Sequence, residues 1–214
     1  MPLHYTTAAI RTLADLKASL HGIESPVVLL EGRRKVAECD KPLLGELARL
    51  LIDELPDVTF RSGNAEGSDT LFGDAVTAIF PDRFEYVVPK ESMGRKRRHA
   101  AAYCIPADQL KAAAEKRLVL YTNQASPDTE RLTKAYTGEV TNARLAAMGA
   151  YLIRDTLKVT GDPDLNLRPA SAAIFYADPT DPLAGGTGHT IRVCLQQHVP
   201  FVLQDVWKQW CRQE

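Results

Sequence analysis

The sequence has few cysteines, and they are scattered. The chain of 214 residues holds only Cys39, Cys104, Cys194 and Cys211, with no Cys-x-x-Cys pair among them. Zinc sites and disulfide frameworks usually bring cysteines closer together in sequence. We therefore expect reduced, mostly structural thiols of the kind found in the cytoplasm, and no bound metal ion.

Long apolar runs and an excess of charge of one sign are also missing. No run of about 18 apolar residues is present, which predicts that the chain has no membrane span. Residues 1–5 lack a basic segment followed by an apolar one, so we expect no signal peptide and a cytoplasmic location. A net charge of -1 gives no overall basic field of the kind that favours nucleic acid.

The composition otherwise suits an ordinary globular protein. Hydrophobic residues make up 45% of the chain and charged residues 25%, which is enough to build a buried core. The length predicts a single domain over residues 1–214.

Short apolar runs alternate with helical patterns along the chain. Strands buried on both faces are predicted at 27–31, 58–60, 84–88, 172–176 and 200–203. Helices are predicted at 7–20, 43–55, 69–80, 140–159 and 188–197, with Trp207 and Trp210 in a short final helix. This order implies right-handed parallel crossovers. We predict an α/β fold with a Rossmann-like open, mostly parallel sheet and helices on both faces.

One segment interrupts this alternation. Residues 90–137 hold the basic run 95–99 and then helical patterns, and the apolar run 118–121 predicts a further short strand. We interpret the segment as an insertion or a lid-like element. The basic run is typical of a solvated surface, although it could instead guide an anionic ligand or a nucleic-acid backbone.

A first glycine-rich turn follows the strand predicted at 58–60. Glycines in such a turn reach backbone conformations that other residues avoid, and a helix start that follows favours anions. The turn is neither a dinucleotide fingerprint nor a P-loop, and a tight strand-to-helix connection is the alternative. Its candidate ligand-binding residues are Ser62, Gly63, Asn64, Gly67 and Ser68.

A second glycine-rich turn follows the strand predicted at 172–176. Three closely spaced glycines would let a ligand approach the main chain, and threonine hydroxyls can donate to phosphate oxygens. A flexible surface loop is the alternative. The candidate ligand-binding residues here are Gly185, Gly186, Thr187, Gly188 and Thr190.

The turn after the first strand adds Gly32, Arg33 and Arg34 to the ligand-binding candidates. Arginine can bind phosphate through two parallel hydrogen bonds, while a solvated charged turn is the alternative. All three turns follow strands, so they would meet at the carboxyl edge of a parallel sheet.

Two residues in the glycine-rich turns are candidates for catalysis. Glu66 could bond a ribose hydroxyl or act as a base, and His189 has an ordinary pKa near neutrality. We expect Ser68 or the acidic Asp69 to cap the helix that follows. Glu31 and Asp178 are further acidic candidates.

These turns resemble those of a known superfamily. Residues 31–35 resemble the Gly-Ser-Arg-Lys turn of the DNA-processing protein A (Smf/DprA) family, with Arg33 in place of the serine. Residues 62–69 resemble that family's Ser-Gly-Leu-Ala-x-Gly-Ile-Asp segment, and residues 184–188 are similar to the Pro-Gly-Gly-x-Gly-Thr turn of the LOG (lysine-decarboxylase-like) phosphoribohydrolases. The chain thus resembles the SMF/DprA–LOG, or SLOG, superfamily over most of residues 27–203.

The resemblance implies a Rossmann-like domain that binds a nucleotide or other phosphorylated small molecule on its two glycine-rich turns. It also implies two alternatives, a nucleotide-cleaving hydrolase like the LOG enzymes and a module that binds single-stranded nucleic acid like DprA. The helix after the second turn lacks the glutamate that the LOG enzymes carry there. We expect the protein to form a homo-oligomer and to need no cofactor.

Overall fold

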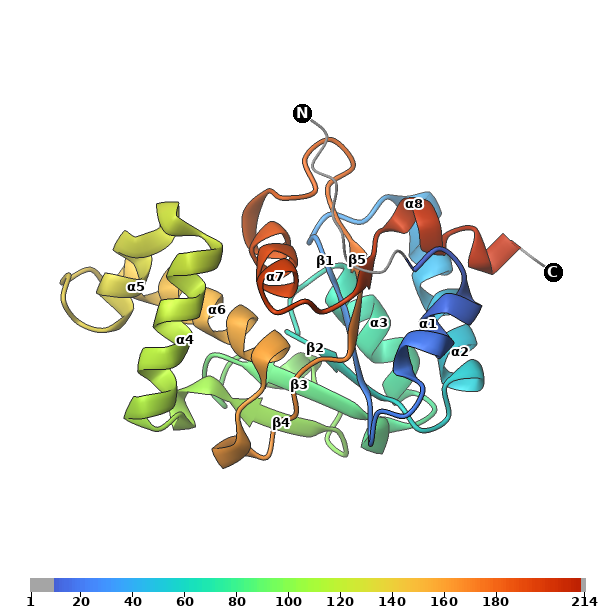
Figure 1. The fold of residues 1–214 in the computed structure, drawn as a ribbon, viewed down its shortest axis with the longest axis horizontal. Coiled ribbons are helices and arrows are strands. Elements are labelled where there is room, and N and C mark those ends of the chain that lie inside the picture. The colour runs from blue at the N-terminus through green and yellow to red at the C-terminus, as the bar shows by residue number, and fades with distance from the viewer. Residues whose placement is uncertain (1–9, 213–214) are drawn as a thin grey trace.

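Six parallel strands form one sheet in the computed structural model, which describes residues 10–212 (Figure 1). Their order in the sheet is β4-β3-β2-β1-β5-β6. The strands are β1 (Val27–Gly32), β2 (Thr59–Ser62), β3 (Phe84–Val88), β4 (Tyr103–Pro106), β5 (Ala172–Tyr176) and β6 (Phe201–Val202). The sheet confirms the predicted α/β fold with an open parallel sheet.

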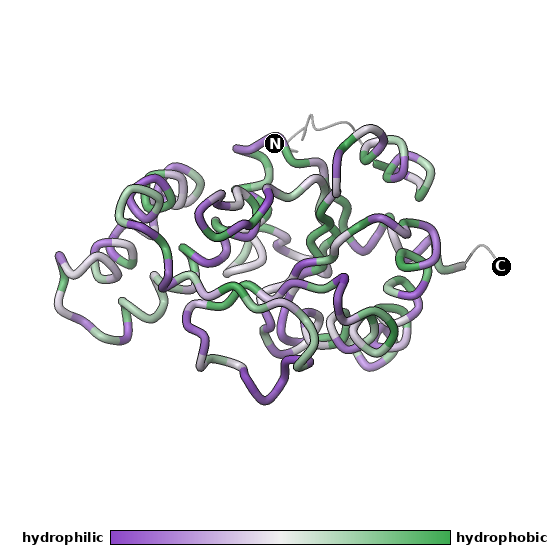
Figure 2. Tube along the Cα trace, turned by 90° about the horizontal axis from the view of Figure 1, so that it is seen from below, coloured by the Kyte–Doolittle hydropathy of each residue, from purple (hydrophilic) through white to green (hydrophobic). Residues whose placement is uncertain are grey.

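The central strands are apolar because both of their faces are covered. β1 begins with Val27-Val28-Leu29-Leu30, all buried, and every residue of β5 is buried as well. Parallel sheets show this continuous apolar pattern when helices pack on both sides. Figure 2 shows the hydrophobic stretches of the chain gathered in the middle of the molecule, where the strands run.

Helices divide between the two faces of the sheet. One face packs against α1 (Leu13–Leu20), α2 (Lys41–Glu54), α3 (Ser68–Thr77) and α8 (Gln204–Trp207). The other packs against α4 (Ala112–Ala125), α6 (Ala143–Thr160) and α7 (Gly185–Gln196), and α5 (Glu130–Tyr136) packs on α6. Short 3₁₀ helices are η1 (Glu38–Asp40), η2 (Pro81–Arg83), η3 (Arg95–Arg97), η4 (Ala107–Gln109), η5 (Pro127–Thr129), η6 (Pro163–Leu165) and η7 (Trp210–Arg212).

The segment 90–137 contributes to both the sheet and a helical layer. It supplies the edge strand β4, then α4 and α5, which lie with α6 at one end of the molecule (Figure 1). The strand predicted at 118–121 is wrong, because these residues lie inside α4. The run of strong helix formers that begins at Ala112 extends through them, and Ala114, Leu118 and Thr122 are buried at intervals of four.

The predicted helix starts also differ from the structure. α2 begins at Lys41 and α6 at Ala143, against predicted starts at 43 and 140. The cap of α3 is Gly67, and the side chains of Ser68 and Asp69 bond elsewhere, so the predicted caps are wrong. α7 begins at Gly185 and not at Gly188 as predicted, so Gly185, Gly186 and Gly188 belong to the helix itself. α1 begins at Leu13 behind a Thr12 cap, and residues 7–9 of the predicted helix lie outside the described residues.

Within residues 10–212, no helix has the length and apolar character needed to cross a bilayer.

Two leucines of α4 test its helical assignment. Leu118 is fully buried against Ile153 and Leu157, whereas Leu120 is 54% exposed. Leu118→Ala should lower the free energy of unfolding by about 2–5 kcal/mol, and Leu120→Ala should change it by less than about 0.5 kcal/mol. Denaturant unfolding of both variants gives the comparison. Equal losses would contradict the helix, because residues two apart share a face only in a strand.

Candidate functional site

The candidate site lies at the carboxyl edge of the sheet, between β1 and β5. From β1 the chain moves outward through β2, β3 and β4 in one direction, and β5 and β6 then extend the sheet in the other. In open parallel sheets, ligands bind outside the carboxyl ends of the strands where the order reverses. A cavity of about 540 Å³ opens at this point, within the range of small-molecule sites.

Four parts of the chain line this cavity. The first is the end of β1 with the turn after it, and the second is the start of α3. The third is a layer made by η5, α5 and α6, and the fourth is the first turn of α7. Charged groups line the floor and one rim, and apolar side chains of α5 and α6 line the wall. The lining residues used below are Glu31, Gly32, Arg33, Arg34, Asp69, Leu132, Met148, Tyr151, Leu152, Arg154, Asp155, Lys158, Gly185, Gly186, Thr187, His189 and Thr190.

Buried charges form the floor of the cavity. Lys158, on α6, bridges Glu31 at the end of β1 and Asp155 one turn earlier, whose Oδ1 lies 2.7 Å from the lysine Nζ. Arg154 pairs with the same Asp155 oxygen at 2.7 Å and donates to the carbonyl of Gly63. A charged group survives such burial only where ion pairs and hydrogen bonds offset its lost hydration.

The floor holds one more carboxylate than cations. Asp155 has two cationic partners, and Asp69 accepts hydrogen bonds from the backbone N–H groups of Gly32 and Ala65. Glu31 has only Lys158, which it shares. The excess proton is therefore best placed on Glu31.

The pKa directions set Asp155 apart from the two other carboxylates of the floor. Burial raises the pKa of Glu31 to about 7, against the lowering effect of Lys158. Burial also raises the pKa of Asp69. For Asp155, burial acts in the same direction, but Arg154 and Lys158 outweigh it and hold its pKa below the usual value.

The first glycine-rich turn contacts the turn after β1, which lines the cavity. Gly67 has a φ of +94°, and a Cβ there would collide with the backbone of Arg34. The hydroxyl of Ser68 donates to the carbonyl of Arg33 at 3.1 Å. This turn therefore packs against the turn after β1 and holds it in place.

The second turn reaches the cavity directly. Gly185, Gly186 and Thr187 line it as the first turn of α7, and no side chain caps this helix. The first N–H groups of an α-helix have no partner within the helix, and the helix dipole favours anions there. Gly188 has a different role, because a Cβ there would collide with the backbone of Leu183.

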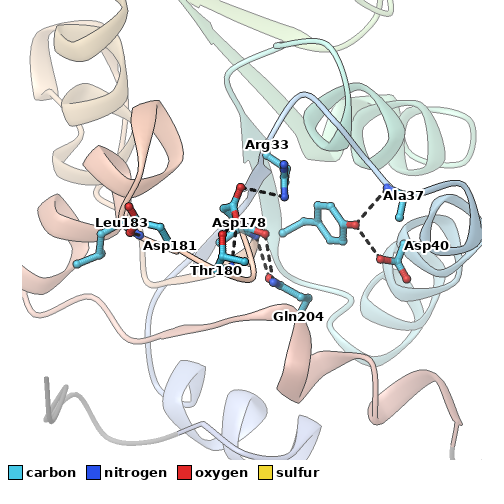
Figure 3. A network of polar contacts seen from close by, with 10 residues as sticks. Arg33, Ala37, Asp40, Asp178, Thr180, Asp181, Leu183 and Gln204 are labelled. Atoms are coloured by element: carbon cyan, nitrogen blue, oxygen red, sulfur yellow. Dashed lines mark hydrogen bonds and ion pairs between the residues drawn. The ribbon is translucent and has the colours of Figure 1, made fainter. Parts of the chain in front are cut away.

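Two arginines lie at the rim. Arg33 pairs with Asp178 at 3.1 Å, which ties the turn after β1 to the loop between β5 and α7 (Figure 3). The hydroxyl of Tyr176, at the end of β5, donates to Asp40 at 2.7 Å. Arg34 is exposed and lines the cavity. The rim thus carries two arginines, one of them paired with Asp178, while the floor carries the acidic groups.

His189 is buried at the inner wall. Its Nδ1 lies 2.7 Å from the hydroxyl of Ser126 and its Nε2 lies 3.1 Å from that of Thr156. Burial lowers the pKa of His189 to about 4. The ring is therefore neutral at neutral pH and joins α7 to α4 and α6.

The structure brings together only part of the predicted site. Of the predicted residues, those that line the cavity are Gly32, Arg33, Arg34, Gly185, Gly186, Thr187, His189 and Thr190. Those outside its lining are Ser62, Gly63, Asn64, Glu66, Gly67, Ser68 and Gly188. Glu66 is exposed and pairs with Arg97 of the basic run at 3.1 Å, and the Arg97 guanidinium also donates to the Asn64 carbonyl.

Sequence reasoning missed the contribution of α6. Arg154, Asp155 and Lys158 follow the usual spacing of a solvated ion-pair face, and such charges are normally exposed. Here they are buried, because α6 lies between the sheet and the helices α4, α5 and α7. The sequence gives no sign of this burial, because Arg154, Asp155 and Lys158 fall on one side of the helix, as they would on a solvated face.

Comparison of this chain with known proteins finds no match. This holds for protein-family models, for curated proteins and for solved structures. The resemblance of the three turns to the SLOG superfamily therefore stays a prediction. Within residues 10–212, no group of three or more His, Cys, Asp or Glu side chains is arranged to hold a metal ion.

Glu31 should make stability depend on pH. Its raised pKa means that the folded state binds the proton more tightly, so its stabilising contribution is complete below the ordinary pKa of 4.5 and is lost as the pH rises through about 7. The difference in unfolding free energy between the wild type and Glu31→Gln should fall by about 3 kcal/mol from pH 4.5 to pH 8.

Denaturant unfolding at several pH values measures this difference, and His189 titrates in both proteins, so its effect cancels. Glu54→Gln, at a half-exposed ion pair with Lys17, serves as the control and should show a nearly constant difference. A constant difference for Glu31→Gln as well would contradict the placement of the proton.

Proposed function

We propose that this protein binds a nucleotide or another phosphorylated small molecule in the cavity between β1, α6 and α7. The observation that carries the proposal is the first turn of α7, which no side chain caps and which lines the same cavity as Arg33 and Arg34. Helix N-termini with nearby arginines are suited to phosphate groups. Their position at the reversal of strand order is the usual ligand site of this architecture.

The charges indicate how such a ligand lies. A Cβ built on Gly186 would lie 3.5 Å from Oδ2 of Asp155, so negative charge already lies beside the inner side of this turn. The phosphate therefore belongs at the outer side, near Gly185 and Arg34. Carboxylates accept hydrogen bonds from hydroxyl groups, so Asp155 and Glu31 suit the sugar of the ligand.

Gly186 provides the test. A Cβ at this position makes only an ordinary contact, so Gly186→Leu should fold, and its side chain should enter the cavity beside Asp155 and occupy the space of the bound ligand. In the wild type, a nucleotide at about 100 times its dissociation constant should stabilise the protein by about 2.7 kcal/mol, visible as a thermal shift. Gly186→Leu should lose this shift.

The matched control is Gly45→Leu, because Gly45 also lies in a helix with open space around it. That variant should keep the ligand-induced shift. A shift of wild-type size in Gly186→Leu would refute binding beside the first turn of α7, and no shift of the wild type with any mono-, di- or cyclic nucleotide would refute nucleotide binding.

Glu31 favours a second candidate function, the hydrolysis of a bound nucleotide. An acid with a pKa near 7 at the floor of a cavity is suited to general acid catalysis. In cleavage of an N-glycosidic bond, Glu31 would protonate the departing base as the carbon–nitrogen bond breaks. A water molecule would form the new carbon–oxygen bond, and its proton would return to the Glu31 carboxylate.

Mass spectrometry of nucleotide mixtures tests this candidate. Release of free base by the wild type should fall by a factor of about 100 or more in Glu31→Gln, while the thermal shift with nucleotide remains. Glu54→Gln should release base at the wild-type rate. If Glu66→Gln abolishes release and Glu31→Gln does not, the sequence-based choice of Glu66 is correct; if the wild type releases no base, the protein only binds.

A further inference from the structure

The wall of the cavity on α6 has an apolar surface that the phosphate site leaves unused. Met148, Tyr151 and Leu152 line the cavity from α6, and Leu132 joins them from α5. Met148 and Tyr151 are three residues apart and therefore lie on the same face of the helix. They are 46% and 38% exposed, although both are large and apolar.

Tyr151 is held in a defined position. The guanidinium of Arg154 lies 5.3 Å from the centre of its ring. Arg154 is itself buried and fixed by Asp155 and by the carbonyl of Gly63. A cation can occupy one face of an aromatic ring while the opposite face remains available for stacking.

We propose that the Tyr151 ring and Met148 bind the aromatic base of a nucleotide whose phosphate lies on the first turn of α7. This inference rests on the proposed function and narrows its ligand from phosphorylated small molecules to nucleotides. Three zones of the cavity match three parts of one molecule. The arginines at the rim match the phosphate, the carboxylates of the floor match the sugar, and the apolar wall matches the base. A sugar phosphate alone would leave the apolar wall exposed to water, at a cost that grows with its apolar area.

Adenosine 5′-monophosphate and ribose 5-phosphate test the inference, because they differ only in the base. Titration calorimetry of the full chain should show that the nucleotide binds at least tenfold more tightly, since stacking of a base on an aromatic side chain contributes this much or more. Tyr151→Ala should weaken binding of the nucleotide by about tenfold and leave binding of ribose 5-phosphate unchanged. Tyr151→Phe keeps the ring and should restore the wild-type affinity.

Two controls separate this inference from the proposed function. Tyr103→Ala removes another exposed tyrosine, on the edge strand β4 and outside the cavity lining, and should leave both affinities unchanged. Gly186→Leu should weaken both ligands. If the wild type binds both ligands with equal affinity and Tyr151→Ala has no effect, the base site is overturned and the phosphate site stands. If the wild type binds neither ligand, both proposals are overturned.

Discussion

The site depends on the buried ammonium group of Lys158. It joins the central strand β1 to α6 through Glu31, and it neutralises Asp155 in the same helix. Removing one partner of such a buried pair typically costs about 3–5 kcal/mol, because the remaining charge is left without compensation. The backbone of the same helix is held as well, since Arg61 of β2 donates to the carbonyls of Lys158 and Arg168. These bonds fix the face of α6 that lines the cavity.

The glycine-rich turns have different roles around this cluster. Gly67 and Ser68 keep the turn after β1 close to α3, so that turn presents Arg33 and Arg34 at the rim. Gly188 lets the start of α7 pack against Leu183, while Gly185 and Gly186 lie at the cavity itself. A glycine-rich turn after a strand thus either allows close packing or lines the cavity. Only its contacts distinguish the two roles, because both demand the same absence of a side chain.

The division of charge within the cavity gives the proposed ligand its orientation. Positive groups lie at the rim, on exposed or half-exposed side chains, where a charge needs little compensation. The acidic groups lie at the floor, where burial raises the pKa of Glu31 and makes it sensitive to pH near neutrality. Between them, the α6 wall with Tyr151 is apolar. An amphipathic ligand with one anionic end satisfies all three zones.

The sequence by itself determined the sheet, because apolar runs such as 27–31 and 172–176 are favourable only as strands covered on both faces. The sequence also indicated which residues lie at the rim of the cavity, since the turns that follow parallel strands meet at one edge of the sheet. It did not determine the edge strand β4, which is short and half-exposed. Nor did it determine the helical state of residues 118–121, because their local preference for a strand is weaker than that of the longer surrounding segment for a helix. The floor of the site was decided by tertiary structure alone. Arg154, Asp155 and Lys158 look like a solvated helix face until α6 is placed between the sheet and its neighbouring helices, where only mutual pairing stabilises their charges.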